Sequence, residues 1–366
     1  MSLWVVVGGQ FGGEGKGKIS AFITKDEEID ICVRCGGPNS GHTFVADDGS
    51  TVLLRQLPTG YIRPETRLLI PAGALIDLDI LKYELDSLRI DPKRVGVDRN
   101  AMIIEQGDRE RESQLQLRDR LSSTLCGVGS AVARRALRGT DVKLAGQCAS
   151  TVAWLAALIT DVSEEVNSGL DRGKKVLVEG TQGFGLSLYH SESYPKATSR
   201  DTTAAGFLSE VGLSPLLVTE IVLVFRTFPI RVAGQQAGPL RNEISWEILQ
   251  RESGYPHPVQ EMTTVSKKVR RVGRFDWELA TLATAVNRPT RIAVNGLDYF
   301  NYRDLNCGGI DELSTVSQDF VQDLGTRLST DICYLGVGPA YRKGLVINHG
   351  SKRREPSLGS CVGSTA

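Results

Sequence analysis

A short apolar run that leads directly into a glycine-rich loop opens the chain and restricts its fold more than any other feature. Residues 3–7 (Leu-Trp-Val-Val-Val) have the composition of a buried strand, and six of the next eleven residues are glycine. Lys16 and Lys18 lie in the same stretch. Glycine lets backbone amides approach an anion closely, and lysine neutralises its charge, so this loop is typical of a phosphate site. The alternative is a tight strand-to-helix turn with two solvated lysines.

The spacing of this loop matches neither common phosphate-binding motif. The Walker pattern requires a glycine five residues before the Gly-Lys pair and a Ser or Thr after the lysine. The chain has Gln10 and Gly17 at those two places. The dinucleotide pattern G-x-G-x-x-G cannot be fitted either. We therefore predict a phosphate loop with a different arrangement.

Further apolar runs that end in small-residue turns recur along the chain. They occupy residues 29–33, 67–70, 174–179, 220–228, 291–294 and 331–335. Such units are typical of an α/β fold whose ligands bind at the carboxyl ends of parallel strands. Because no internal repeat and no Pro/Ser-rich linker divides the chain, we expect one large domain over residues 1–350 with a central, mostly parallel sheet. Residues 351–366 are expected to form a loose polar tail, and residues 149–169 a single helix.

Charge and cysteine content exclude several classes of protein. Lys+Arg and Asp+Glu both number 43, so the formal net charge is zero. This argues against a protein that coats nucleic acid or an anionic membrane, and no stretch has the length of a membrane span. Seven dispersed cysteines fit a reducing compartment better than a disulfide framework, so a cytoplasmic location is expected.

Three other loops carry side chains suited to anions. His42 follows the glycine-rich turn 36–41, and the hydroxyl-rich loop 122–129 precedes a basic helix. Residues 263–273 combine hydroxyls with four cations, a composition that binds phosphate or carboxylate groups. Solvated loops and a capped surface helix are the alternatives at each place.

Six ordered stretches together resemble the adenylosuccinate synthetase family over about residues 3–341. They are residues 10–18, 37–43, 179–183, 194–203, 267–276 and 336–339. The resemblance implies the family's P-loop-NTPase-related fold, a homodimer and a need for Mg²⁺. It also implies a ligase that joins L-aspartate to C6 of a purine nucleotide. In the family the γ-phosphate of GTP is transferred to O6, and the aspartate amine then displaces phosphate from C6.

The resemblance also implies roles for individual residues. His42, Lys16 and Gln182 would be catalytic, and the backbone carbonyl of Gly41 would help to hold Mg²⁺. Arg134 or Arg135 would cross the dimer interface to the partner's nucleotide. The substrate aspartate would bind Thr264, Ser266, Lys268 and Arg270. The nucleotides would bind Gly12, Gly13, Glu14, Gly15, Lys16, Gly17, Asn39, Gly41, Thr124, Arg134, Arg135, Gln182, Thr198, Arg270, Asn295, Asp298, Gly336 and Gly338.

One departure from the family pattern bears on the substrate. The family loop reads Gly-Asp-Glu-Gly-Lys-Gly, and Gly13 stands where the catalytic aspartate is expected. The chain resembles the phage branch that lacks this aspartate and makes N6-succino-2-amino-2′-deoxyadenylate from dGMP, the route to 2-aminoadenine DNA. Because a bare glycine leaves room for the 2-amino group, dGMP is the favoured substrate. An IMP-using, GTP-dependent adenylosuccinate synthetase and an inactive nucleotide-binding paralogue are the alternatives.

A second departure concerns the phosphate donor. The family segment Thr-Lys-Leu-Asp, whose lysine stem covers the guanine, is here Asn295-Gly-Leu-Asp298. Asp298 still favours guanine, whereas Gly296 relaxes the site, so GTP, ATP and dATP all remain candidate donors. The expected partners are dGMP or IMP, L-aspartate, the nucleoside triphosphate and a second copy of the chain. If the chain is phage-encoded, the host cytoplasm is its expected location.

Overall fold

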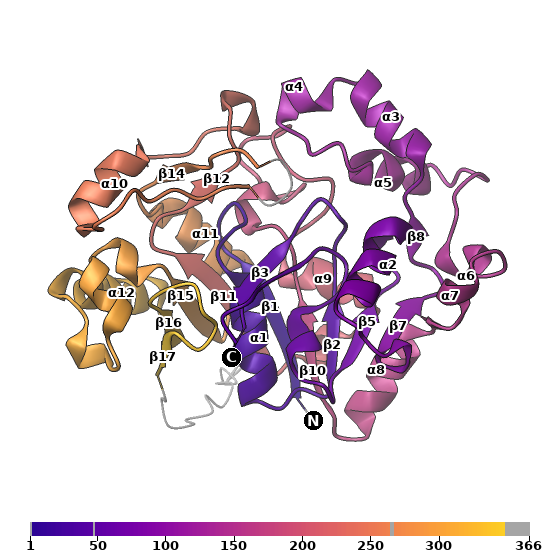
Figure 1. Ribbon diagram of the computed structural model, residues 1–366, viewed down its shortest axis with the longest axis horizontal. Helices are drawn as coiled ribbons and strands as arrows, with labels where there is room; N and C mark the ends of the chain where they lie inside the picture. Colours follow the sequence, from indigo (N-terminus) through magenta and orange to yellow (C-terminus); the bar gives the residue numbers. More distant parts are fainter. Residues whose placement is uncertain (1, 47, 264–266, 348–366) are drawn as a thin grey trace, which may run out of the picture.

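The apolar run at the start of the chain forms β1 (Ser2–Gly8), the strand around which the structure is built. This computed structural model describes residues 2–46, 48–263 and 267–347. β1 lies inside a ten-stranded sheet of order β17-β16-β15-β11-β1-β10-β2-β5-β7-β9 (Figure 1). All neighbours pair in parallel except β16 and β17. The predicted α/β fold with a mostly parallel central sheet is confirmed.

The sheet strands follow the predicted apolar runs closely, because a strand of a parallel sheet is covered on both faces. Leu3, Val5, Val6 and Val7 have no exposed surface. The other strands of this sheet are β2 (Ile31–Arg34), β5 (Arg67–Ile70), β7 (Val95–Asp98), β9 (Ile159–Thr160), β10 (Lys175–Glu179), β11 (Glu220–Arg226), β15 (Arg291–Asn295), β16 (Asp331–Gly336) and β17 (Gly344–Val346).

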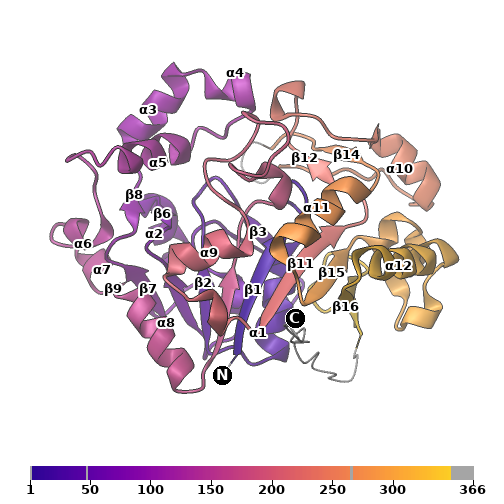
Figure 2. The same cartoon turned by 180° about the vertical axis from the view of Figure 1, so that it is seen from behind.

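Helices cover both faces of the sheet. On one face, apolar residues of α8 (Val162–Asp171), α9 (Ala204–Val211), α11 (Trp277–Asn287) and α12 (Thr315–Leu328) join those of the strands in one core (Figure 2). On the other face, α1 (Lys16–Asp26) contributes Ile19 and Ile23 to a second core. A third core contains residues of α2 (Leu78–Ser87) and of the hairpin β3 (His42–Val45) and β4 (Thr51–Leu54).

Two smaller groups of elements lie beyond the carboxyl ends of the central strands. One contains α3 (Gln106–Gln114), α4 (Leu117–Leu121) and α5 (Val128–Ala136). The other contains α10 (Trp246–Ser253) and a small sheet of β12 (Ile230–Arg231), β13 (Glu243–Ile244) and β14 (Arg271–Gly273) (Figure 1). The remaining β-strands and α-helices are β6 (Leu75–Ile76), β8 (Met102–Ile103), α6 (Ala145–Cys148) and α7 (Ala153–Ala156).

The helix predicted over residues 149–169 is wrong. α7 ends at Ala156, β9 pairs with β7, and α8 begins only at Val162. Asp161 ends the extended segment, since its side chain accepts a hydrogen bond from the amide of Glu164 and caps α8. Apolar periodicity alone did not separate these three short elements.

The domain boundary at residue 350 stays a prediction, and the tail 351–366 lies outside the described residues. Within the described ranges, none of the helices combines the length and apolar character that crossing a bilayer requires.

Candidate active site

The glycine loop folds around its own glutamate. Glu14 is fully buried, and its Oε1 accepts hydrogen bonds from the amides of Gln10 (3.1 Å) and Gly12 (2.8 Å). Its Oε2 lies 2.6 Å from Nζ of Lys16, which also donates to the carbonyl of Gln182. Lys16 and Lys18 are 3% and 5% exposed, so the alternative of two solvated lysines is wrong.

The glycine loop joins the carboxyl end of β1 to the N-terminus of α1. Gly15 precedes the helix with a φ of 91°, and no side chain caps the first turn. A Cβ at Gly15 would lie 2.7 Å from Nδ2 of Asn295, which donates to the carbonyl of Glu14 (2.8 Å). Free amides in the first turn of a helix attract anions. The loop therefore has the properties of the predicted phosphate site.

A buried network holds His42 at the end of the neighbouring strands. Glu179, at the end of β10, accepts from Nη1 of Arg34 (2.8 Å) and from the amide (2.8 Å) and hydroxyl (2.7 Å) of Thr59. Nδ1 of His42 donates to the same carboxylate. Burial raises the pKa of Glu179, but His42, Arg34 and Thr59 outweigh this effect and lower it to about 2.

The second ring nitrogen of His42, Nε2, is available to bind a ligand. Nε2 is buried and has no hydrogen-bond partner among the described residues. Burial and the nearby charge of Arg34 lower the pKa of His42 to about 4. A buried polar atom without a partner is costly, so its presence beside a cavity indicates a place where substrate binds.

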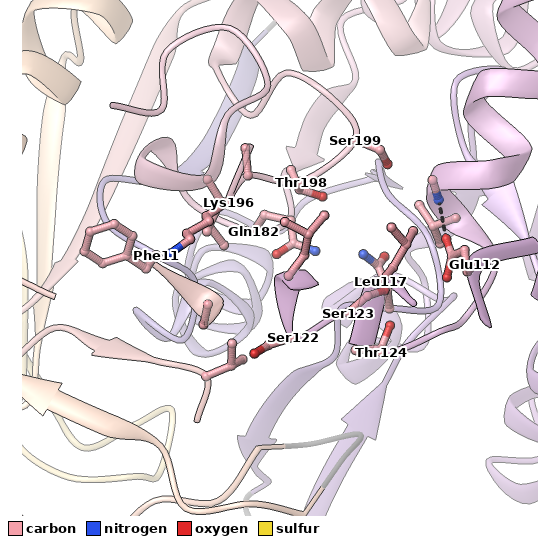
Figure 3. Close-up of a pocket in the computed structure, with 18 of the residues that line it drawn as sticks. Phe11, Glu112, Leu117, Ser122, Ser123, Thr124, Gln182, Lys196, Thr198 and Ser199 are labelled. Carbon is pink, nitrogen blue, oxygen red and sulfur yellow. Dashed lines mark hydrogen bonds between the residues drawn. The ribbon is translucent and has the colours of Figure 1, made fainter. Parts of the chain in front are cut away.

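Two adjacent cavities lie between these loops. The larger, of 350 Å³, is lined by Phe11, Gly12, Gly13, Lys16, Asn39, Ser40, Gly41, His42, Arg118, Ser122, Ser123, Thr124, Gln182, Leu186, Val232, Ala233, Thr263, Lys268 and Arg270. The smaller, of 220 Å³, shares eight of these residues and extends to Lys196, Thr198, Ser199 and Arg231. In Figure 3, Gln182 and Thr198 lie across the smaller cavity from Ser122, Ser123 and Thr124.

Half of the predicted site residues line these two cavities. The larger contains ten of them: Gly12, Gly13, Lys16, Asn39, Gly41, His42, Thr124, Gln182, Lys268 and Arg270. Thr198 lines the smaller one. Glu14 and Gly15 lie inside the glycine loop, and Gly17 lies in the first turn of α1, where a Cβ would come within 2.7 Å of Cβ of His42. Thr264 and Ser266 lie outside the described residues.

The predicted donor residues form a separate group at the ends of β15 and β16. The amide of Gly296 donates to the carbonyl of Gly336 (3.1 Å), beside Asn295. Lys18 donates to the carbonyl of Gly338 (2.6 Å). Asp298 is 4% exposed and accepts a hydrogen bond from the hydroxyl of Tyr255. The two lysines of the glycine loop therefore point to different places, Lys16 to the larger cavity and Lys18 to this group.

Arg134 and Arg135 line neither cavity. The guanidinium of Arg134 pairs within its own chain with Glu105 (2.9 Å), Asp108 (2.7 Å) and Asp141 (3.4 Å). Arg135 donates to the carbonyl of Ala72 (3.0 Å). The predicted contact across a dimer interface therefore stays a prediction.

Several site residues were not identified from the sequence. Ser122 and Ser123 lie in the hydroxyl-rich loop that was singled out, but only Thr124 was assigned a role there. Arg226 was missed because its partners are distant in sequence: it donates to the carbonyl of Gly13 (3.0 Å) and pairs with Glu261. Burial lowers the pKa of Arg226, but Glu261 outweighs burial and raises it. Arg226, which is held by Glu261, therefore connects the end of β11 to the glycine loop.

Comparison with known proteins identifies the family. Residues 5–146 and 140–305 match the family model described as adenylosuccinate synthetase. The curated adenylosuccinate synthetase of Thermococcus onnurineus is 38% identical over 343 residues, which cover 93% of this chain and 96% of the relative. The chain belongs to the adenylosuccinate synthetase family. The enzyme of the same name from Methanocaldococcus jannaschii is 39% identical over 92% of this chain and 94% of its own length.

Solved structures agree with this assignment. The adenylosuccinate synthetase of Plasmodium falciparum has a TM-score of 0.82 at 21% identity, over 95% of this chain and 100% of that one, which shows a shared fold. The cyanophage S-2L succinoaminodeoxyadenylate synthetase (PurZ), bound to dGMP and to dATP as an energy donor, has a TM-score of 0.80 at 27% identity. It covers 94% of this chain and 95% of its own length. Adenylosuccinate synthetases are carbon–nitrogen ligases, and this chain is a ligase of that family.

Adenylosuccinate synthetases use Mg²⁺ and a phosphate donor, and the larger cavity offers few protein ligands for the ion. The described residues contain no group of three His, Cys, Asp or Glu side chains that could hold a metal. Gly13 supplies no carboxylate, and Glu14 is paired with Lys16. Mg²⁺ is commonly bound through substrate phosphates with only one or two protein oxygens. The site therefore fits an ion held chiefly by nucleotide phosphates, and the role of the Gly41 carbonyl as a protein ligand stays a prediction.

Replacing Glu179 with glutamine is expected to destabilise the protein by about 3 kcal/mol or more, because it leaves the buried charge of Arg34 unpaired. The measurement is chemical denaturation at pH 7.

The same carboxylate makes stability depend on pH. Since the pKa of Glu179 is about 2 in the folded chain and 4.5 ordinarily, the stabilisation by Glu179 is present above pH 4.5 and is lost as the pH falls towards 2. The variant should lack this acid-dependent loss. Thr59→Val, which removes one hydrogen bond to the same carboxylate, should cost only about 1 kcal/mol. Equal costs for the two variants would contradict the network.

Proposed function

We propose that this ligase joins L-aspartate to C6 of dGMP and forms N6-succino-2-amino-2′-deoxyadenylate, with hydrolysis of a nucleoside triphosphate. The observation that carries the proposal is Gly13. It lines the larger cavity together with His42, Lys16 and Gln182. A purine placed there meets bare backbone at position 13 instead of a carboxylate.

The surroundings of Gly13 are adapted to the absence of a side chain. A Cβ at this position would lie 2.7 Å from Cδ1 and 3.1 Å from Cγ1 of Ile230. Ile230 is 1% exposed and packs in a core with Phe228, Trp246, Leu249 and Val272. The φ of Gly13 is +72°, a conformation that disfavours side chains. An aspartate would therefore require both strained backbone and a shift of a well-packed neighbour.

The structural likeness to PurZ supports the proposal, since that protein was solved with dGMP bound. The archaeal relatives, named adenylosuccinate synthetases and 38% to 39% identical, favour the second candidate, an IMP-using enzyme. Gly13 argues against the IMP-using candidate, because the family's aspartate at this position takes the N1 proton of the purine and Gly13 has no carboxylate. The inactive-paralogue alternative loses support, since His42, Lys16 and Gln182 meet in one cavity.

The chemistry proceeds in two steps. First the N1 proton passes to solvent and its electron pair is delocalised onto O6. O6 then bonds to the γ-phosphorus while the bond from that phosphorus to the diphosphate breaks, and the nucleoside diphosphate departs. Then the aspartate amine bonds to C6 and passes a proton to solvent, while the C6–O6 bond breaks and phosphate leaves with that electron pair. Bound Mg²⁺ would neutralise phosphate charge. Lys16 provides a fixed positive charge, Nε2 of His42 faces the reacting phosphoryl group, and Lys268 and Arg270 bind the aspartate carboxylates.

A homodimer in the cytoplasm is part of the proposal. Arg134 or Arg135 would have to leave its present contacts to reach a partner's nucleotide. Leu137, next to them at the end of α5, is 78% exposed and is an apolar side chain that such an interface would cover.

Turnover by the purified enzyme tests the proposal. IMP, GMP and dGMP are each supplied with L-aspartate, Mg²⁺ and GTP, ATP or dATP, and phosphate release and product mass are measured. We expect dGMP to be the best acceptor, with a product whose mass corresponds to addition of aspartate and loss of water. Faster turnover of IMP than of dGMP would favour the second candidate.

A further inference from the structure

Arg118, on the short helix α4, is a cation of the larger cavity that has no assigned role. It is exposed and lines this cavity, and its guanidinium makes no hydrogen bond or ion pair with any of the described residues. The other cations of the cavity come from different elements. Lys16 pairs with Glu14 (2.6 Å), and Lys268 and Arg270 belong to the loop 263–273.

The geometry of α4 directs Arg118 to the larger cavity. Leu117 and Leu121, four residues apart on one side of the helix, line the smaller cavity, whereas Arg118 lines the larger one. Ser122 follows the helix. Its amide donates to the carbonyl of Arg118 (2.9 Å), and its hydroxyl donates to the carbonyl of Ala233 (3.3 Å) in the wall of the larger cavity. The turn that carries Arg118 is therefore anchored beside this cavity.

The polar residues that line both cavities have no formal charge. They are Asn39, Ser122, Ser123, Thr124 and Gln182. Their hydroxyls and amides can donate hydrogen bonds to phosphate oxygens but cannot neutralise them. A phosphate monoester carries a charge of about −1.5 to −2 at pH 7. Arg118, one turn before Ser122, adds a positive charge to these neutral donors.

Other cations near these neutral donors are engaged elsewhere. Lys196 lines only the smaller cavity, and its Nζ donates to the carbonyl of Gln235 (3.4 Å). Figure 3 shows Lys196 on the Phe11 side of this cavity. Arg134 and Arg135, the candidates for a contact with a partner's nucleotide, are held by ion pairs and by a backbone carbonyl within their own chain.

We propose that Arg118 binds the 5′-phosphate of the purine monophosphate from within its own chain. A purine with C6 at His42 directs its 5′-phosphate away from the reacting atoms, towards the hydroxyl-rich loop 122–129. A guanidinium offers paired N–H donors that match two phosphate oxygens. The inference rests on the proposed function for the position of the purine, and it adds the cation that binds the other end of the nucleotide.

An Arg118→Ala variant tests the inference. Initial rates give the KM for the monophosphate and the KM for L-aspartate separately, with dGMP and with IMP as acceptor. We expect the KM for the monophosphate to rise at least about tenfold, because a charge-assisted hydrogen bond is lost, and the KM for L-aspartate to change less than about twofold. Arg118→Lys keeps the charge but loses the paired donors, so its KM should lie between those of the wild type and Arg118→Ala.

The matched control is Arg120→Ala. Arg120 lies on the same helix, lines neither cavity and donates to the carbonyl of Leu115 (3.4 Å). This control should keep both wild-type KM values. An unchanged KM for the monophosphate in Arg118→Ala, or a rise in the KM for L-aspartate alone, would overturn the inference.

Mixed dimers test whether the contact lies within one chain. Arg118→Ala and His42→Asn chains with different tags are co-expressed and purified through both tags. Because Arg118 and His42 line the same cavity, neither site of the mixed dimer is complete, and its rate at low dGMP or IMP should not exceed that of Arg118→Ala. Failure to obtain a mixed dimer would also support a contact within one chain. Recovery of about half the wild-type rate would show that Arg118 acts across the interface.

A binding measurement separates this inference from the proposed function. Calorimetric titration compares dGMP with deoxyguanosine and IMP with inosine. The wild type should bind each monophosphate at least about tenfold more tightly than its nucleoside, and this difference should shrink in Arg118→Ala. If IMP is turned over faster than dGMP but the difference shrinks, the proposed function fails and the role of Arg118 stands. If dGMP is the better acceptor and the difference stays, only the role of Arg118 fails.

Discussion

A His42→Asn variant is expected to lose turnover by a factor of about 10²–10³, the usual effect of removing one donor that stabilises charge in a transition state. Nε2 of His42 is a buried polar atom that faces the larger cavity without a partner among the described residues. Asparagine keeps an amide near Glu179 but is too short to place a donor where Nε2 lies. The effect should therefore fall on kcat, with a smaller change in KM, as measured by phosphate release.

The matched control is His190→Asn. His190 stacks on Phe184 with ring centroids 5.7 Å apart and lines neither cavity. This control should retain most of the wild-type kcat, and the circular dichroism of both variants should resemble that of the wild type. A loss of less than about tenfold in His42→Asn would show that the ring does not act on the reacting groups.

The second large effect is expected from Gly13→Asp. Because a Cβ at this position would lie 2.7 Å from Cδ1 of Ile230, Ile230 must first shift. The new carboxylate would then crowd the 2-amino group of dGMP and restore an acceptor for the N1 proton. We expect the ratio of kcat/KM for dGMP to that for IMP to fall at least about tenfold. The variant should also be less stable by about 1–3 kcal/mol, because the side chain is forced against Ile230 in a left-handed backbone conformation.

A double variant separates specificity from overcrowding. Ile230→Val removes Cδ1, the atom 2.7 Å from the new Cβ, and alone should cost about 1 kcal/mol. Combined with Gly13→Asp, it should recover part of the lost stability and raise IMP turnover further. If Gly13→Asp folds but leaves the substrate ratio unchanged, the glycine does not determine the choice between dGMP and IMP.

The sheet was predictable from the sequence for a simple physical reason. Strands covered on both faces must be apolar throughout, so runs such as 3–7 and 174–179 were recognisable without any knowledge of their neighbours. The glycine loops were recognisable because only glycine permits such close backbone approach. The single helix predicted over residues 149–169 was wrong, because a helix, an edge strand and a second helix can share one apolar pattern. The pairing of β9 with β7 determines which residues form the strand.

The contacts that tune the site could not be predicted in this way. Ile230 meets Gly13 from 217 positions away, and Tyr255 reaches Asp298 through the packing of four aromatic rings. The network of Arg34, His42 and Glu179 joins three different strands. The sequence around each of these residues gives no sign of its partner, because the two members of each contact come together only when the chain folds.

The position of β1 has a consequence for synthesis of the chain. Although the glycine loop ends at residue 18, the strands that pair with β1 are β10 and β11, and β11 ends at Arg226. Ribosomes add about 5–20 residues per second, so the loop is exposed for roughly ten seconds or longer before its second neighbouring strand is made. A nascent chain stalled before Arg226 should therefore fail to protect β1 from a protease, although the loop left the ribosome long before.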